Sequence, residues 1–134
     1  MTKINVKIIV KYWQEGAERS WDVAKSLWKS KKYDFCLFCC HLTLEKILKA
    51  IVVKKSKKHA PHGHNLLILA KKAKIELNEK QAHYLAQITE FNISARYPEI
   101  KLKFYKMCTK NFSEEYFNFT KKFYLWLKKY LKNL

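Results

Sequence analysis

The sequence has very few turn-forming residues, because only two glycines and two prolines occur among its 134 residues. A sheet protein needs such residues about every 8–12 positions, so this scarcity argues against an all-β architecture and predicts a mostly helical fold. No uninterrupted apolar run reaches the roughly 18 residues of a membrane-spanning helix. We therefore expect no membrane association, and a single domain over residues 1–134.

The sequence also lacks the features of a secreted protein. Its N-terminus, "MTKINVKIIVKYW", has no long apolar stretch followed by a small-residue cleavage site, so we expect no signal peptide. Three of the four cysteines, Cys36, Cys39 and Cys40, crowd one segment, and Cys108 lies far away. This spacing is poor for a disulfide framework and favours a cytoplasmic location.

Arginine and acidic residues are scarce relative to lysine. The formal net charge is +17, and Arg19 and Arg96 are the only arginines. Such a field attracts polyanions, but lysine is a hydrated point charge, whereas the recognition of bases and phosphates favours the planar fork of arginine. Two interpretations stay open: a functional basic surface, or a lysine-biased composition without a role in binding.

Hydrophobic periodicity predicts an all-α fold, an up-and-down antiparallel helical bundle of four long helices plus a short one. We expect the helices at residues 10–29, from 33 to the lysine run at 54–58, at 65–74, from 78 to about 96, and from 113 onward. Asn65 and Asn78 are expected as N-caps. Pro98 should end the fourth helix, and residues 99–111 should form a connector with some helical character.

Aromatic residues are abundant, with twenty in the chain. An apolar stripe on the last helix repeats at helical spacing and comprises Phe112, Tyr116, Phe119, Phe123, Leu127 and Tyr130. One core of this size does not comfortably bury so many rings. We therefore expect a homodimer, with the stripe facing either the core or a second subunit.

Few side chains suggest chemistry. Cys36-x-x-Cys39 followed by His59, His62 and His64 superficially matches zinc ligands, but cysteines in the middle of an apolar helix usually pack as small hydrophobes. Glycine-rich phosphate loops and nucleophile motifs are absent. We expect no metal site, no cofactor and no catalytic residue.

A polar set interrupts the otherwise apolar second helix. His41 and Glu45 lie four residues apart on one face, and Lys46 and Lys49 flank them. The set is either a satisfied core pair or part of a ligand site. Arg96, followed by Tyr97 at the end of the fourth helix, either stabilises the helix terminus or contacts a phosphate or base.

Three segments, "YDFCLFCCHLTLEKILKAIVV", "HGHNLLILA" and "ISARYP", together resemble the HEPN (higher eukaryotes and prokaryotes nucleotide-binding) domain family. The resemblance implies a helical bundle that commonly dimerises, often encoded beside a small nucleotidyltransferase and acting in toxin–antitoxin or nucleotide-handling pairs. The matching positions are His41, Glu45, Lys46, His64, Asn65, Arg96 and Tyr97.

The resemblance also implies that some members are ribonucleases, with an arginine followed by a polar residue and, a few positions later, a histidine. No histidine follows Arg96, so the general acid or base is missing from its expected place. We therefore expect a binding module for a nucleotide or another polyanion, or a partner of a small nucleotidyltransferase. A ribonuclease toxin, using His41 or His83, and a purely structural partner are the alternatives.

The three segments suggest one spatial hypothesis. His64 and Asn65 begin the third helix, Arg96 and Tyr97 end the fourth, and both pairs are expected to converge near Glu45. In the empty protein Arg96 is expected to pair with Glu45, and to release it for a phosphate when a ligand binds.

Overall fold

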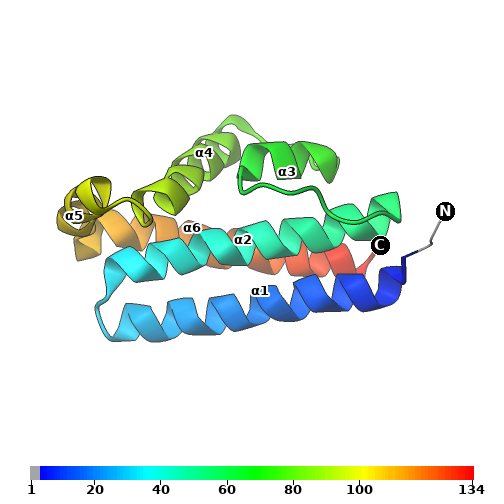
Figure 1. The fold of residues 1–134 in the computed structure, drawn as a ribbon, viewed down its shortest axis with the longest axis horizontal. Coiled ribbons are helices and arrows are strands. Elements are labelled where there is room, and N and C mark those ends of the chain that lie inside the picture. Colours follow the sequence, from blue (N-terminus) through cyan, green and yellow to red (C-terminus); the bar gives the residue numbers. More distant parts are fainter. Residues whose placement is uncertain (1–3) are drawn as a thin grey trace.

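A computed structural model describes residues 4–134 and forms six α-helices over that range. They are α1 (Val6–Lys29), α2 (Tyr33–Ser56), α3 (Leu66–Lys72), α4 (Glu79–Ser94), α5 (Pro98–Met107) and α6 (Lys110–Lys132). Helices α1, α2 and α6 run side by side along the molecule, α3 and α4 lie over α2, and α5 lies at one end (Figure 1). The prediction of an all-α bundle is confirmed.

Two short helices accompany the four long ones, where one was expected. The segment after Pro98 is a ten-residue helix instead of a partly helical connector. Pro98 occupies the first helical turn, where its missing N–H would have no intrahelical partner in any case, so the proline starts α5 as well as separating it from α4.

Capping side chains set the helix boundaries. Asn65 accepts hydrogen bonds from the amides of Leu67 and Ile68, and Asn78 forms a capping box with Gln81, as the sequence predicts. Asn5 begins α1 four residues earlier than expected, and Thr109 begins α6 three residues earlier. In both cases a short polar side chain accepts an orphan amide of the first turn.

Helix α2 is the centre of the bundle. Its buried side chains occur on every face, because α1, α3, α4 and α6 pack around it. The core side chains with no exposed surface include Leu37, Leu44, Ile47, Leu48 and Ile51. Polar groups on α2 therefore have to find their partners inside the protein.

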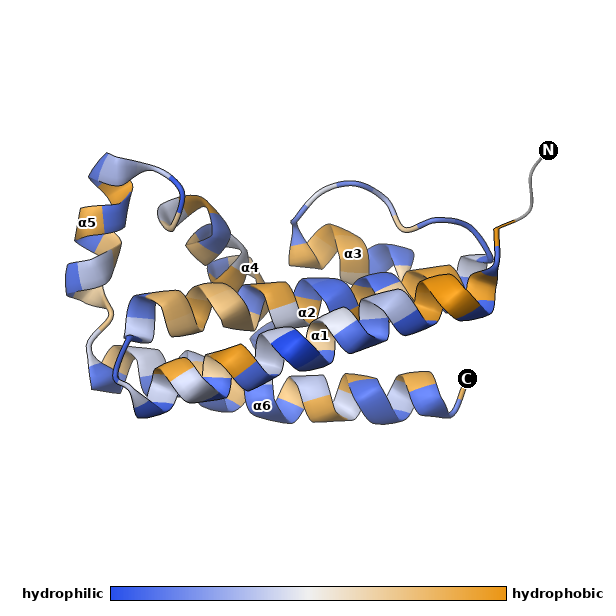
Figure 2. Cartoon of the chain, turned by 60° about the horizontal axis from the view of Figure 1, so that its bottom comes forward, coloured by the Kyte–Doolittle hydropathy of each residue, from blue (hydrophilic) through white to orange (hydrophobic). Residues whose placement is uncertain are grey.

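The aromatic stripe of α6 faces this core. All six of its side chains are buried or half-buried within the chain, so the stripe packs against the core of the bundle. Hydrophilic and hydrophobic residues alternate along α6 in Figure 2, as expected of a helix with one buried face. The homodimer stays a prediction, now resting on other exposed side chains, such as Ile100, Leu102 and Tyr105 of α5.

No helix within residues 4–134 combines the length and the apolar character needed to cross a bilayer.

A hydrogen-bonded triplet joins the two outer helices α1 and α6. The hydroxyl of Tyr124 and the ammonium of Lys128 both donate to Glu18 Oε2, at 2.6 and 2.9 Å. These two bonds lower the pKa of Glu18, while burial and the Glu18 carboxylate raise the pKa of Tyr124. Since the folded carboxylate has a lowered pKa, its contribution to stability is present at neutral pH and is lost as the pH falls through that value.

We predict that Tyr124→Phe lowers the free energy of unfolding at neutral pH by about 1 kcal/mol, because one buried hydrogen bond is lost and the ring is kept. The difference from the wild type should shrink in acid, where Glu18 is protonated. Urea unfolding followed by circular dichroism at neutral and acidic pH measures both effects. Tyr105→Phe is the control, because Tyr105 is 63% exposed and its hydroxyl has no partner among the described residues. A loss independent of pH would contradict the role given to Glu18.

Candidate functional site

Four polar side chains meet where α2 packs against the loop before α3: the buried His41, Glu45 and Lys49 of α2, and the half-exposed His64 of the loop. We name them the Glu45 cluster. The three residues of α2 are four positions apart and share one helix face, and all three are buried. A charged group in such surroundings is tolerated only when it is paired and hydrogen-bonded.

Glu45 is the shared acceptor of the cluster. Lys49 Nζ donates to its Oε2 at 3.1 Å, and His64 Nδ1 donates to its Oε1 at 2.8 Å. The ammonium of Lys49 also lies 5.1 Å from the centre of the Trp13 ring on α1. Both carboxylate oxygens are thus occupied, and the buried charge of Lys49 is neutralised.

The loop that carries His64 is held in place on both sides of this residue. Gly63 has φ +117, a conformation that a residue with a side chain rarely adopts. Asn65 caps α3, and the amide of Leu66 donates to Thr89 Oγ1 on α4 at 3.1 Å. His41 Nε2 donates to the carbonyl of His64 at 2.7 Å, because a carbonyl can only accept. The position of His64 is therefore set by α2, α3 and α4 together.

His41 anchors this loop. Its Nε2 carries the proton, so in the neutral ring Nδ1 is an acceptor; this atom is buried without a hydrogen bond, 3.9 Å from Glu45 Oε1. Burial is the main cause that lowers the pKa of His41, and the charges of His64 and Arg96 lower it further, against the raising effects of the His64 carbonyl and Glu45. A buried, neutral and already bonded imidazole is a positioning group and cannot reach a large substrate.

His64 has the opposite character. Its Nδ1 donates to Glu45, so Nε2 of the neutral ring is an acceptor, and the side chain is 50% exposed. Nε2 has no hydrogen-bond partner among residues 4–134. A histidine whose ring is oriented by a carboxylate can take up a proton, or donate one to an anion when protonated.

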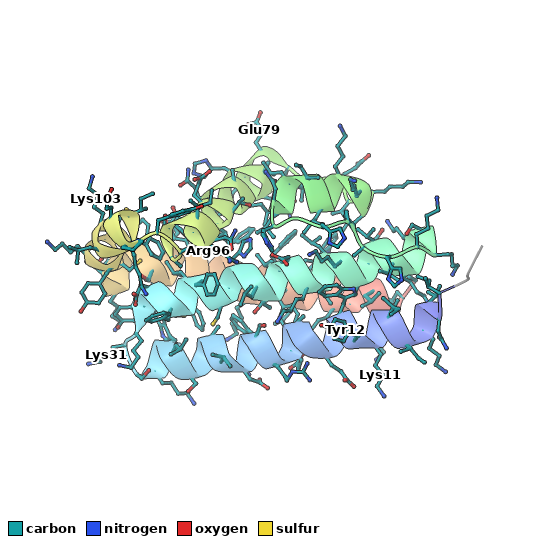
Figure 3. The ribbon with its side chains drawn as sticks, viewed as in Figure 1. Lys11, Tyr12, Lys31, Glu79, Arg96 and Lys103 are labelled. Atoms are coloured by element: carbon teal, nitrogen blue, oxygen red, sulfur yellow. The ribbon has the colours of Figure 1, made fainter. Side chains whose placement is uncertain are left out.

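Arg96 lies beside the cluster at the turn between α4 and α5, next to α2 (Figure 3). Its Nε donates to Oδ1 of the buried Asn92 at 3.0 Å, and its guanidinium lies 5.8 Å from the centre of the Phe38 ring. Its positive charge is the smallest of the causes that lower the pKa of His41. The remaining guanidinium N–H groups have no partner within the described part of the chain.

The expected ion pair between Arg96 and Glu45 is wrong. Asn92, in the last turn of α4 and four residues before Arg96, accepts the hydrogen bond from Nε of Arg96, and Lys49 and His64 already occupy both oxygens of Glu45. Asn92 was not among the predicted site residues, although its position four residues before Arg96, at the end of a predicted helix, was a usable signal.

The structure separates the other proposed site residues from the cluster. Lys46 donates to Ser20 Oγ of α1 at 2.9 Å, because a step of one residue from Glu45 turns its side chain to a different face of α2. Tyr97 is 58% exposed beside Arg96, and Asn65 is occupied in capping α3. His83, named for the ribonuclease alternative, is on α4 with its ring edge-on to Tyr84.

The cysteines and histidines do not assemble a metal site. Within residues 4–134 no group of three or more His, Cys, Asp or Glu side chains could hold a metal ion. Cys36 Sγ donates to the carbonyl of Ala24 at 3.3 Å, and burial raises the pKa of Cys39 to about 11. These thiols pack as small apolar side chains.

Comparison with known proteins gives one match. A model of the HEPN domain family matches residues 10–130. No curated protein and no solved structure matches the chain.

We predict that Glu45→Gln destabilises the fold by about 3–5 kcal/mol, because it leaves Lys49 buried without a counter-charge. The double variant Glu45→Gln/Lys49→Met removes that charge and should recover most of the loss. Urea unfolding of both variants measures the difference. Glu15→Gln serves as the control, since Glu15 is exposed and its contact with Lys11 is 3.8 Å, and it should change the free energy of unfolding little. A double variant as unstable as the single one would refute the pairing argument.

Proposed function

The chain belongs to the HEPN domain family, and from that premise we propose that it is a binding module for a phosphate-bearing ligand, with a nucleotide as the first candidate. The observation that supports the proposal is how the guanidinium of Arg96 is held. Its guanidinium is held by Asn92 and Phe38, while its remaining N–H groups are open to a ligand. A preoriented planar fork suits two phosphate oxygens.

The surroundings of Arg96 support the same ligand. The charges of Glu45 and Lys49 cancel, so the positive charge of Arg96 is uncompensated locally, and the exposed His64 adds a second donor when it is protonated. Tyr97 presents an exposed ring on which a base can stack. The net charge of +17 steers anions toward the protein.

We further propose that the protein works in contact with another chain, either a second copy of itself or a small nucleotidyltransferase, as in a toxin–antitoxin pair. The exposed apolar side chains on and beside α5 support this, since apolar side chains gathered at one end of a chain can be covered by a partner. They are Ile93, Tyr97, Ile100, Leu102, Tyr105 and Met107.

A ribonuclease is the second candidate, and the Glu45–His64 pair is the observation that favours it. The sequence lacks a histidine after Arg96, but His64 supplies a carboxylate-oriented imidazole from a different segment. In this reaction Nε2 of His64 removes the proton of a ribose 2′-hydroxyl, the 2′-oxygen attacks the phosphorus, and the 5′-oxygen leaves with a proton from water. Arg96 would stabilise the negative charge that builds up on the phosphate.

We predict that ATP or GTP binds in the micromolar range, more weakly at high salt, and that Arg96→Ala lowers the affinity at least about tenfold by removing a charged hydrogen-bond donor. Isothermal titration calorimetry at two salt concentrations measures this. Arg19→Ala is the matched control, because Arg19 is the other arginine and is exposed on α1. Absence of heat at either salt concentration, or equal losses in the two variants, would end the nucleotide proposal.

For the ribonuclease candidate, we predict that His64→Asn abolishes cleavage of bulk RNA. The asparagine amide can still donate to Glu45 in place of Nδ1, but it has no counterpart of Nε2. His83→Asn should cleave RNA like the wild type. A wild-type protein without cleavage, or an active His64→Asn variant, excludes the candidate and leaves the binding proposal standing.

A further inference from the structure

A lysine-lined groove runs between α1 and α6, away from the Glu45 cluster. It consists of two connected hollows of about 810 and 640 Å³, which share Val10, Gln14, Lys54 and Lys128. None of its lining residues belongs to the Glu45 cluster. It lies toward the end of the bundle where α1 begins and α6 ends, opposite α5 (Figure 1). Seven lysines line it: Lys7, Lys11, Lys54, Lys57, Lys128, Lys129 and Lys132. We name it the lysine groove.

Most of this positive charge is uncompensated. Only two carboxylates, Glu15 and Glu18, line the groove. Glu15 makes an exposed contact with Lys11, and Glu18 is occupied by Lys128 and the hydroxyl of Tyr124. The other five lysines have no acidic partner among residues 4–134. A hollow lined by one sign of charge concentrates the field and attracts an anion with several charges.

A row of aromatic rings, one from α4 and four from α6, adjoins the groove. The rings of Tyr84, Phe119, Phe123, Trp126 and Tyr130 follow one another at centroid distances of 4.5, 5.3, 6.0 and 5.5 Å. Each ring is inclined to the next by 10° to 28°. Trp126 is 47% exposed, whereas the other four rings are buried or half-buried. Trp126 is therefore the ring of this row with the most surface open to a ligand.

The groove and the row form one continuous surface. Lys129 and Asn133 line both the lysine groove and a hollow of about 350 Å³ that contains Trp126. Trp126 also lines a further hollow of about 340 Å³, together with Lys80 and Lys122. A path of lysines thus bends around α6, with an exposed indole beside it.

We propose that this path binds single-stranded nucleic acid without sequence preference. Lysines would contact successive phosphates, and a base would stack on Trp126, the combination of cationic groove and aromatic platform that suits single strands. The lining contains no arginine, so it offers no planar fork to read base edges.

The curvature of the lysine path favours a flexible polyanion over a rigid one. An α-helix is only about 10–12 Å across, whereas duplex DNA has a persistence length of about 50 nm, so a duplex cannot follow the bend around α6. An acidic peptide could pair with the lysines, but the exposed indole of Trp126 would add nothing to its binding. The site is separate from Arg96 and does not depend on the proposed nucleotide site.

The test measures binding of a fluorescein-labelled oligouridylate by fluorescence anisotropy over a range of salt concentrations. We expect Lys129→Gln/Lys132→Gln to weaken binding about tenfold and to reduce the salt slope by about 1.4, or about 0.7 for each lost phosphate contact on a single strand. The matched control is Lys103→Gln/Lys106→Gln on α5, which has the same loss of charge, helix spacing and exposure; Figure 3 shows Lys103 at the opposite end from Lys11. Circular dichroism verifies the fold of each variant.

A second variant tests stacking. Trp126→Ala should weaken binding of the oligouridylate about 5- to 140-fold, which corresponds to the loss of one stacked base at about 1–3 kcal/mol, and should leave binding of inorganic polyphosphate unchanged. Phe35→Ala on α2 removes an aromatic ring of similar exposure that lies outside the lining of these hollows, and it should affect neither ligand.

Three results would overturn the proposal. Equal losses in the two lysine variants would mean that only the net charge matters. Displacement of the oligouridylate by polyglutamate at equal charge would indicate an acidic peptide, and equal binding of a duplex would refute the argument from curvature. ATP binding by Arg96→Ala tests the nucleotide proposal, and the two matched lysine variants test this one, so the failures of the two proposals are distinguishable.

Discussion

The buried carboxylate of Glu45 is the interaction on which the arrangement of the polar side chains around α2 depends. An ionised side chain at the centre of an apolar bundle requires cations and hydrogen bonds around it, and α2 by itself supplies only Lys49 within reach. The second partner, His64, comes from the loop before α3. The need to satisfy one charge therefore fixes a loop, orients an imidazole, and brings the start of α3 against α2, where His41 holds the same loop by its carbonyl.

Arg96 and the lysines of the groove differ in how firmly their side chains are held. Arg96 is tethered by Asn92 and an aromatic ring, so its open N–H groups point from a fixed position. The side chains of the groove lysines are long, flexible and mostly unpaired. They would attract an anion through the number of their charges. A single oriented fork suits one small anion, whereas a row of mobile charges suits an extended one. The two proposed sites therefore suit different ligands, because one cation is held in place and the others are mobile.

Much of the fold and part of the site could be predicted because the signals are local. The caps Asn65 and Asn78 act within one helical turn, and the apolar stripes have the helical period. His41 and Glu45 could be placed on one face by their spacing alone. The pairing of Arg96 could not be predicted, because Asn92 and Glu45 were both suitable acceptors, and only the packing of α4 against α2 decides which one the guanidinium reaches.

The sequence by itself determined the helical class, the apolar α2 and the family, since these depend on periodicity and on short motifs whose spacing is visible in the chain. The tertiary structure decided which polar groups meet: it joined His64 to Glu45 across 19 positions, turned Lys46 toward α1, and set the lysines of α1, α2 and α6 around one groove. Contacts between distant segments depend on how helices rotate and cross as their apolar faces pack, and no local pattern encodes that rotation.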